Sequence, residues 1–309
     1  MRRTPRPSRR GGFTLIELLV VIAILALLVG LTMAGIGRVK SGQMAATTET
    51  TVKKLQVAVN QQLSAAFDDA NKRTNPHINL IGSAIGDLDE ERDKALLSYA
   101  YSKRNFPMNF AEANLAILGT PPIPKHTSFA QIPVATGLSS DQQAAVLLYI
   151  IVHDQSGRGT TLDADGALAG AETVLTDPAN NRQYKAYKDA YGTHIAFLRW
   201  YGSHTTDPHY QELQSPPFIN PKDGSKDPFD RLGKLMQNPW PAPNQRANVL
   251  LALNNLATIK LGDAATLPPG NFDGRNRVIT VVSAGPDKTF GTDDDVYGFR
   301  LARFGDKAN

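Results

Sequence analysis

The sequence of 309 residues predicts an α+β protein, in which one long N-terminal helix packs on a globular head that contains a small antiparallel sheet. Two observations support this fold class. No proline occurs from Thr14 to Asn75, which permits one helix of about 60 residues and roughly 90 Å in length. In the tail, residues 277–283 and 296–304 have the apolar and β-branched composition that is typical of strands.

The predicted long helix, residues 13–75, has two parts. Residues 13–33 are apolar all round apart from Glu17, and about 20 apolar residues suffice to cross a bilayer, so we predict a transmembrane segment. Residues 34–75 are amphipathic, because apolar or small side chains recur at steps of three and four. The head is expected to pack on this stripe, which consists of Ala45, Thr48, Val52, Leu55, Val59, Leu63 and Ala66.

The head, residues 76–309, is predicted to carry large helical insertions. Residues 88–106 have acidic side chains in the first turn and basic ones in the last, an order that the helix macrodipole favours. Residues 141–153 form an apolar helix, for which Ser139 or Ser140 is the expected N-cap.

Loops are expected to take up much of the remaining head. Residues 201–244 are dense in Pro, Gly, Asp and His, and we interpret them as an excursion from the core. Residues 248–259 have helical spacing of apolar side chains. The two strand-like runs of the tail then enclose a loop, residues 283–296.

The formal net charge of +4 belongs to the N-terminus. Residues 1–12 hold five of the 33 basic residues, and without them 28 basic residues face 29 acidic ones, a net charge of about −1. Basic residues ahead of an apolar segment follow the positive-inside rule, so the charge gives no reason to expect nucleic-acid binding. The chain has no cysteine, which excludes disulfides and thiolate chemistry.

The most specific motif is Gly-Gly-Phe-Thr-Leu-Ile-Glu-Leu-Leu-Val-Val-Ile, residues 11–22. It places one carboxylate, Glu17, five residues after Gly12 in an otherwise apolar helix, and a membrane segment rarely carries such a charge without a use. An ordinary export signal needs small residues just after its apolar core, and residues 32–34 supply these poorly. A twin-arginine signal fails on spacing, because two glycines separate the arginines from Phe13.

This segment resembles the prepilin signal of type IV pilins and type II secretion pseudopilins. In that family a prepilin peptidase cuts after the glycine that matches Gly12, and the new N-terminal residue, here Phe13, is methylated. The glutamate that matches Glu17 guides assembly into a helical filament. The resemblance therefore implies that residues 1–12 are a leader. In a staggered filament, Glu17 of one subunit would pair with the Phe13 ammonium of a neighbour, which offsets the desolvation of both charges.

The resemblance also implies a place in the cell and a set of partners. The chain is expected to cross the inner (cytoplasmic) membrane once, with its head in the periplasm or outside, as part of a bacterial envelope filament. The expected partners are the prepilin peptidase, other pseudopilin subunits in homo- or hetero-filaments, the inner-membrane assembly platform and membrane lipid. The role is structural and not enzymatic.

The tail loop contains four carboxylates within nine residues: Asp287, Asp293, Asp294 and Asp295. They repel one another unless a cation lies among them, and hard divalent cations favour such oxygen ligands. The loop is similar to the C-terminal calcium loop of major type II pseudopilins, which implies calcium as the cofactor. The alternative is an acidic turn in water. Residues 189–192, Asp-Ala-Tyr-Gly, resemble the turn that precedes this loop in the family, although about 90 residues intervene here.

A second metal candidate is weaker. Asp163, Asp165 and Glu172 occupy positions three, five and twelve of a loop that resembles an EF-hand when it is counted from Thr161. Position one is threonine instead of aspartate, so a turn is favoured over a metal site.

Histidines provide the only hint of an enzyme. His194, His204 and His209, with Asp207 nearby, are candidate zinc ligands in principle. Their spacings of ten and five fit no standard ligand pattern, so surface histidines are favoured. A membrane-anchored extracytoplasmic metal-dependent enzyme stays as an alternative.

The sequence as a whole favours a pseudopilin-like structural subunit of a type II secretion filament that exports protein. The alternative within the family is a type IV pilin for adhesion, motility or DNA uptake. The tail loop favours secretion, since many pilins close this region with a cysteine pair, and this chain has no cysteine.

Overall fold

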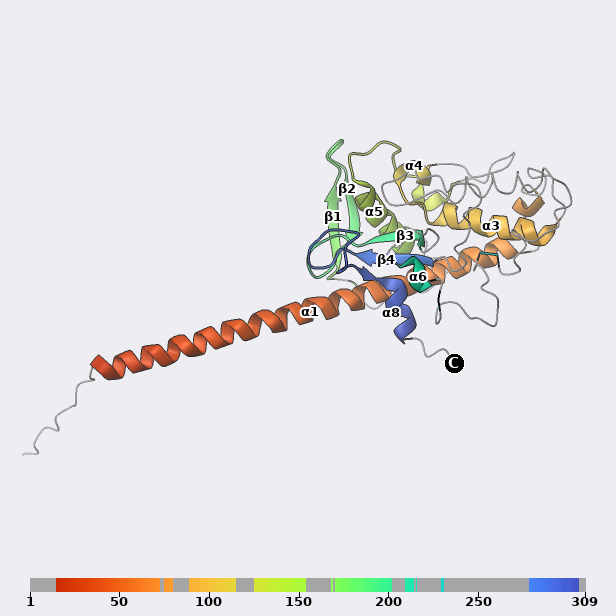
Figure 1. Ribbon diagram of the computed structural model, residues 1–309. Helices are drawn as coiled ribbons and strands as arrows, with labels where there is room; N and C mark the ends of the chain where they lie inside the picture. The colour runs from red at the N-terminus through yellow and green to blue at the C-terminus, as the bar shows by residue number, and fades with distance from the viewer. Residues whose placement is uncertain are drawn as a thin grey trace, which may run out of the picture. The chain divides into compact units, whose positions relative to one another are not determined.

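The computed structural model describes residues 15–72, 75–79, 89–114, 125–153, 168, 170–201, 209–213, 215, 229–230 and 278–305. The chain divides into two compact units, Met1–Ala46 and Thr47–Asn309. One helix, α1 (Leu15–Asn71), begins in the first unit and ends in the second (Figure 1).

The first unit contains the N-terminal part of α1, with Glu17 in its first turn. Apolar side chains from Leu15 to Val29 are largely exposed. Among the described residues, no helix combines the length and the apolarity needed to cross a membrane.

In the second unit, α1 buries the stripe that its sequence predicts. Thr48, Val52, Leu55 and Val59 are fully buried, and Ala66 is nearly so. Polar side chains such as Lys53 and Asn60 lie on the exposed side of the helix. The amphipathic interpretation of this part of α1 is confirmed.

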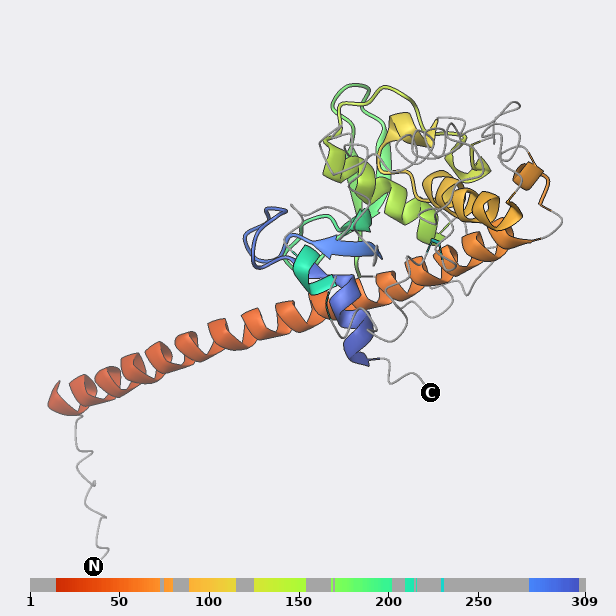
Figure 2. The same cartoon turned by 45° about the vertical axis from the view of Figure 1, so that its right-hand side comes forward.

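Two longer helices accompany α1, and both agree with the sequence. Helix α3 (Glu90–Asn105) runs beside the C-terminal part of α1 (Figures 1 and 2). Its N-cap is Asp89, whose carboxylate accepts hydrogen bonds from the first turn. Helix α5 (Ser140–His153) packs against strands of the head. Ser139 precedes it and donates its N–H to Gln142 Oε1 at 3.1 Å, as in a capping box.

Other helices in the part of the chain that the structure describes are short. Among them are α4 (Phe110–Ala113), the 3₁₀ turn η1 (Thr127–Phe129), α6 (Tyr210–Leu213) and α8 (Gly298–Gly305).

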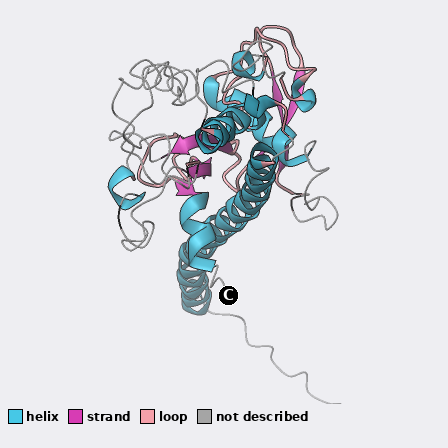
Figure 3. Cartoon of the chain, turned by 90° about the vertical axis from the view of Figure 1, so that its right-hand side faces the viewer, coloured by secondary structure: helices cyan, strands magenta, loops and turns pink. Residues whose placement is uncertain are grey.

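The strands of the described residues form two small antiparallel sheets, which Figure 3 shows in magenta. One pairs β1 (Glu172–Thr176) with β2 (Gln183–Tyr187). The other has the order β3-β4-β5, with β3 (Ala196–Tyr201), β4 (Val278–Ser283) and β5 (Val296–Tyr297). Helix α5 packs against β2 and β3, and α8 packs against β4. The α+β class with a small antiparallel sheet is therefore confirmed.

One predicted strand is wrong in its length. The strand expected over residues 296–304 ends at Tyr297, and α8 begins at Gly298. The physical reason is tertiary, because Gln56 of α1 occupies the backbone groups of β4 that a longer β5 would pair with. Gly298 lies directly against that carboxamide, where a Cβ atom would collide with it.

Three strands, β1, β2 and β3, lie within residues 172–201, where no strand was predicted from the sequence. The predicted helix over residues 248–259 and almost all of the predicted excursion over residues 201–244 lie outside the described residues.

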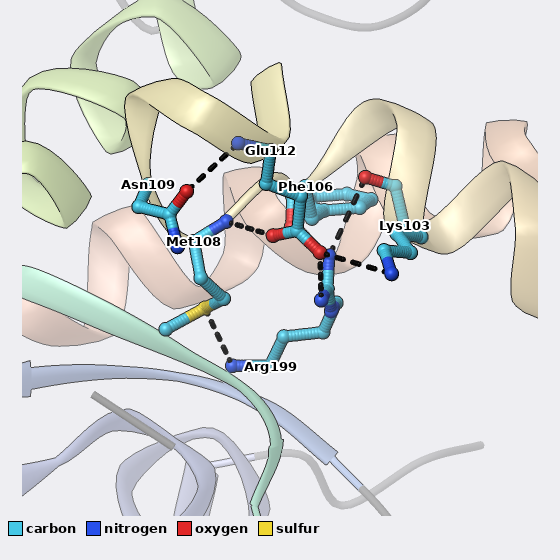
Figure 4. A network of polar contacts seen from close by, with 6 residues as sticks. All are labelled: Lys103, Phe106, Met108, Asn109, Glu112 and Arg199. Atoms are coloured by element: carbon cyan, nitrogen blue, oxygen red, sulfur yellow. Dashed lines mark hydrogen bonds and ion pairs between the residues drawn. The ribbon is translucent and has the colours of Figure 1, made fainter. Parts of the chain in front are cut away.

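A buried ion pair joins β3 to the segment that follows α3 (Figure 4). Arg199 Nη2 lies 2.6 Å from Glu112 Oε1, and both side chains are almost fully buried. The other carboxylate oxygen accepts from Met108 N at 2.7 Å, and Arg199 Nη1 donates to Phe106 O at 2.8 Å. Lys103 Nζ lies 3.6 Å from Glu112, and burial lowers the pKa of this lysine. These contacts fix the end of α3 on the sheet.

Candidate functional site

The processing residues of the N-terminus are only partly described. Gly12 and Phe13 lie outside the described residues, whereas Glu17 lies in the first turn of α1. A carboxylate near the start of a helix interacts favourably with the partial positive charge of that end.

The tail loop that follows β4 folds back on itself. Gly285 has a φ of +64°, and a Cβ atom at this position would collide with the carbonyl group of Asp294. Asp287 N donates to Asp294 Oδ2 at 3.1 Å, which joins the two sides of the loop. Only glycine meets both the conformational and the steric requirement at residue 285.

The loop carboxylates accept hydrogen bonds from the loop itself. Asp294 accepts from Thr292 Oγ1 at 2.6 Å, which is the main reason why the pKa of Asp294 lies below its usual value. Asp287 Oδ1 accepts from Thr289 N at 2.8 Å. Asp293 is exposed to solvent.

Asp295 is the most buried of these carboxylates. Its Oδ2 accepts from Gly291 N at 2.7 Å and from the Tyr297 hydroxyl at 3.1 Å. Its Oδ1 is buried and has no hydrogen-bond partner among the described residues. Burial raises the pKa of Asp295 above its usual value and also raises that of Tyr297.

No three His, Asp or Glu side chains gather closely enough to hold a metal ion within the part of the chain that the structure describes. In this conformation Asp287, Asp294 and Asp295 instead accept hydrogen bonds from N–H and O–H donors of the loop. The calcium assignment of Asp287, Asp293, Asp294 and Asp295 stays a prediction.

The turn at residues 189–192 lies at the start of the tail loop. Asp189 is buried, and its Oδ1 accepts from Tyr191 N and Thr193 N, both at 2.9 Å. Its Oδ2 accepts from Ser283 Oγ at 2.7 Å, across a separation of 94 residues. The turn and the start of the tail loop are therefore in contact, although about 90 residues separate them in the sequence.

Helix α1 also contacts this turn. Thr48 is fully buried and its Oγ1 accepts from Ala190 N at 3.2 Å. The helical spacing of α1 predicts that Thr48 is buried but does not predict its hydrogen bond.

The histidines have separate partners. His194 Nε2 lies 2.7 Å from Asp141 Oδ2, and the imidazole packs on Phe290 of the tail loop with ring centroids 5.5 Å apart. The hydrogen bond with His194 is the main cause that lowers the pKa of Asp141 to about 2. His209 Nδ1 lies 2.9 Å from Arg300 Nη2.

His194 and His209 are each half-buried, and each has a polar partner within the head. His204 and Asp207, the other members of the candidate zinc set, lie outside the described residues.

The second metal candidate is also only partly described. Glu172 is the first residue of β1, where its carboxylate accepts from the Tyr149 hydroxyl at 3.4 Å and lies 3.7 Å from Lys185 Nζ. Asp163 and Asp165 lie outside the described residues.

Gln56, a polar residue of the interior, was not predicted from the sequence; it is 2% exposed and bonds to the backbone of β4. The available signal is a glutamine directly beside Leu55 of the buried stripe of α1, where neighbouring positions are apolar.

Comparison with known proteins identifies the N-terminus. Residues 7–33 match the family described as the prokaryotic N-terminal methylation motif, and this range includes Gly12, Phe13 and Glu17. No curated protein and no solved structure matches the chain. The N-terminal segment of the chain is therefore that of the type IV pilin and pseudopilin family.

Proposed function

We propose that the chain is a pseudopilin-like structural subunit of a type II secretion filament that exports protein. The observation that carries this proposal is the methylation motif at residues 7–33. Processing by a prepilin peptidase and assembly with other pilin-like subunits follow from the motif. In the proposed mechanism, cleavage after Gly12 exposes Phe13, and subunits then leave the inner membrane through an assembly platform and join the filament.

We propose further that residues 13–33 anchor the unassembled subunit in the inner membrane, with the head outside the cytoplasm. The support is compositional, because no charged residue occurs between Leu18 and Met33. The arginines ahead of this segment favour a cytoplasmic N-terminus.

The choice of secretion over a pilus rests on the tail. The turn at residues 189–192 contacts the start of an acidic loop through the bond between Asp189 and Ser283. The chain has no cysteines with which to close this region. A type IV pilin is the second candidate, because the methylation motif is common to both kinds of filament.

Calcium binding by the tail loop is also a proposal. It is supported by the carboxylate density of the loop and by the buried Asp295 Oδ1, which lacks a donor among the described residues. The hydrogen bonds that the carboxylates make to loop donors would have to be exchanged for the ion. Titration of the full chain in detergent with calcium, in parallel with Asp293→Ala plus Asp295→Ala, tests this. Stoichiometric binding that the double variant loses supports the site, and no binding refutes it.

Deletion of this chain tests the main proposal. If the chain belongs to a secretion filament, a bacterium that lacks it should accumulate exported proteins in the periplasm, and its surface pili should be unchanged. Loss of surface pili with normal secretion would support the pilin alternative. A Gly12→Leu chain that keeps its leader is the matched control, because it is made but not processed.

A further inference from the structure

Gln56 is a buried polar side chain on the face of α1 that packs against the head. Its Nε2 donates to Ile279 O and its Oε1 accepts from Val281 N, both at 2.8 Å. One carboxamide thus bonds to both a carbonyl and an N–H of β4, as the peptide group of a neighbouring strand would. The two residues of β4 that it contacts are more than 220 positions away in the sequence.

This contact completes the edge of the sheet. In the part of the chain that the structure describes, β5 pairs with β4 only at Val282 and Ser283. The chain then leaves the sheet at Gly298 to form α8. Unpaired buried backbone groups are costly, so the edge of β4 needs another partner beyond that point. The Gln56 carboxamide supplies it.

The carboxamide can be satisfied in one orientation only. Val281 N is a donor and Ile279 O is an acceptor, so oxygen and nitrogen of the side chain cannot exchange places. The second N–H of Gln56 donates to Asn60 Oδ1, one helical turn further along α1, at 2.9 Å. Gly298 closes the site from the side of α8, since a Cβ atom there would collide with the carboxamide.

The apolar side chains around Gln56 do not define a unique register. Val52, Leu55 and Val59 recur at helical spacing, so a shift of α1 by one turn, about 5.4 Å, replaces one apolar contact with a similar one. Gln56 would lose both bonds to β4 in such a shift, and β4 would be left with two unpaired groups. A single buried polar residue specifies the register of coiled coils in the same way.

We propose that Gln56 is a positioning residue that sets the register of α1 on strand β4 of the head, in addition to the bond that Thr48 makes with the turn at Ala190. The inference depends on contacts inside the second unit and holds for a secretion filament and for a pilus alike.

The test measures register directly in the full-length chain in detergent. Because the chain has no native cysteine, spin labels can be attached at Lys53→Cys and Ala179→Cys, two exposed positions on α1 and on the turn between β1 and β2. The parent chain should give one narrow distance peak. Gln56→Leu should give a second discrete peak, because a one-turn shift moves the α1 label by about 5 Å along the helix axis.

Two further variants distinguish a shift in the register of α1 from a general loss of packing between α1 and the head. Gly298→Ala should produce the second peak although Gln56 is intact, because the added methyl group displaces the carboxamide. Gln56→Glu should show the second peak at about pH 9 and the parent distance at about pH 5. A protonated carboxyl group has the shape of the carboxamide and again offers one donor and one acceptor, and burial raises the pKa of such a group.

The matched control is Gln62→Leu, which replaces another buried glutamine of α1 that has no hydrogen bond to β4 among the described residues. It should keep the single parent peak. A single unshifted distance peak in both Gln56→Leu and Gly298→Ala would overturn the proposal. A label-to-label distance in Gln56→Glu that is the same at about pH 5 and about pH 9 would also overturn it. If Gln56→Leu fails to fold, Gly298→Ala and the pH series of Gln56→Glu decide the question.

Discussion

Single residues of the head carry charge in places where water cannot reach it. Arg199 and Glu112 are nearly fully buried and 2.6 Å apart. Breaking such a pair is costly, because the remaining charge stays buried without a partner. Glu112 also accepts the N–H of Met108, so it stabilises the backbone as well as the guanidinium.

We therefore expect Glu112→Gln to lower the free energy of unfolding by about 3–5 kcal/mol. Urea denaturation of the full chain in detergent, followed by circular dichroism, measures the change. The matched control is Glu172→Gln, which breaks a longer and partly exposed contact to Lys185 and should have a far smaller effect. Equal effects of the two substitutions would contradict the assigned importance of burial.

The pair of His194 and Asp141 gives a pH dependence. Its hydrogen bonds lower the pKa of Asp141 from 3.8 to about 2. A depressed carboxyl pKa stabilises the fold above pH 3.8, and this contribution is lost as pH falls toward 2. After allowance for solvent screening of this partly exposed group, the loss is about 1 kcal/mol.

Denaturation at a series of acidic pH values measures this loss. Asp141→Asn should be less stable than the parent chain above pH 4 and should approach it near pH 2. A difference between the two chains that does not change with pH would show that the carboxylate charge is not responsible.

At the scale of elements, local patterns predict the long helices α1, α3 and α5 and strand β4 well, but they miss strands β1, β2 and β3. The spacing of Val52, Leu55 and Val59 predicts the buried face of α1, and the cap at Asp89 lies one residue from the predicted start of α3. Strand β2 does alternate between exposed and buried side chains, but Lys185 at its centre lowers its strand propensity. Alternation across Gln183–Tyr187 was the signal available for it.

The end of β5 is determined by a long-range contact, which a local sequence pattern cannot predict. Residues 296–304 have strand composition, yet the chain becomes helical at Gly298 because Gln56 already bonds to the edge of β4. The determining contact involves a residue more than 200 positions away. In the candidate site, too, the local elements are predicted and the long-range contact is not. The sequence predicts the turn at Asp189 and the tail loop but not the hydrogen bond between Asp189 and Ser283.

The tail loop, as an element, depends on Gly285. Substitution Gly285→Ala adds a Cβ atom against the Asp294 carbonyl at a φ of +64°, so it should destabilise the loop by about 1–3 kcal/mol. Hydrogen exchange should show faster exchange of the Asp287 amide, which donates to Asp294. Gly291→Ala is the matched control, since its φ is +90° but the space around it is open. A larger effect at Gly291 than at Gly285 would mean that strain and not collision dominates.

The whole molecule combines an N-terminal segment that matches the prokaryotic N-terminal methylation motif with a head, and no solved structure matches the chain. The two are linked by one continuous helix, α1. If Phe13 becomes the N-terminus, its ammonium and the Glu17 carboxylate are the opposite charges available to neighbouring subunits within the apolar segment. The head, by contrast, is defined by long-range contacts such as those of Gln56 and Arg199.

Substitution Glu17→Leu separates processing from assembly. The helix becomes more apolar, so membrane insertion and cleavage after Gly12 should continue, and intact mass should show a chain that begins at methylated Phe13. Filament formation should fall roughly a hundredfold or more, because an ammonium left buried without its partner costs about 3–5 kcal/mol. Sheared filaments, quantified against the membrane-bound subunit, measure this. Glu17→Asp keeps the charge on a shorter side chain and should retain part of the assembly. Processed Glu17→Leu subunits that form filaments in normal amounts would show that assembly does not depend on this charge pair.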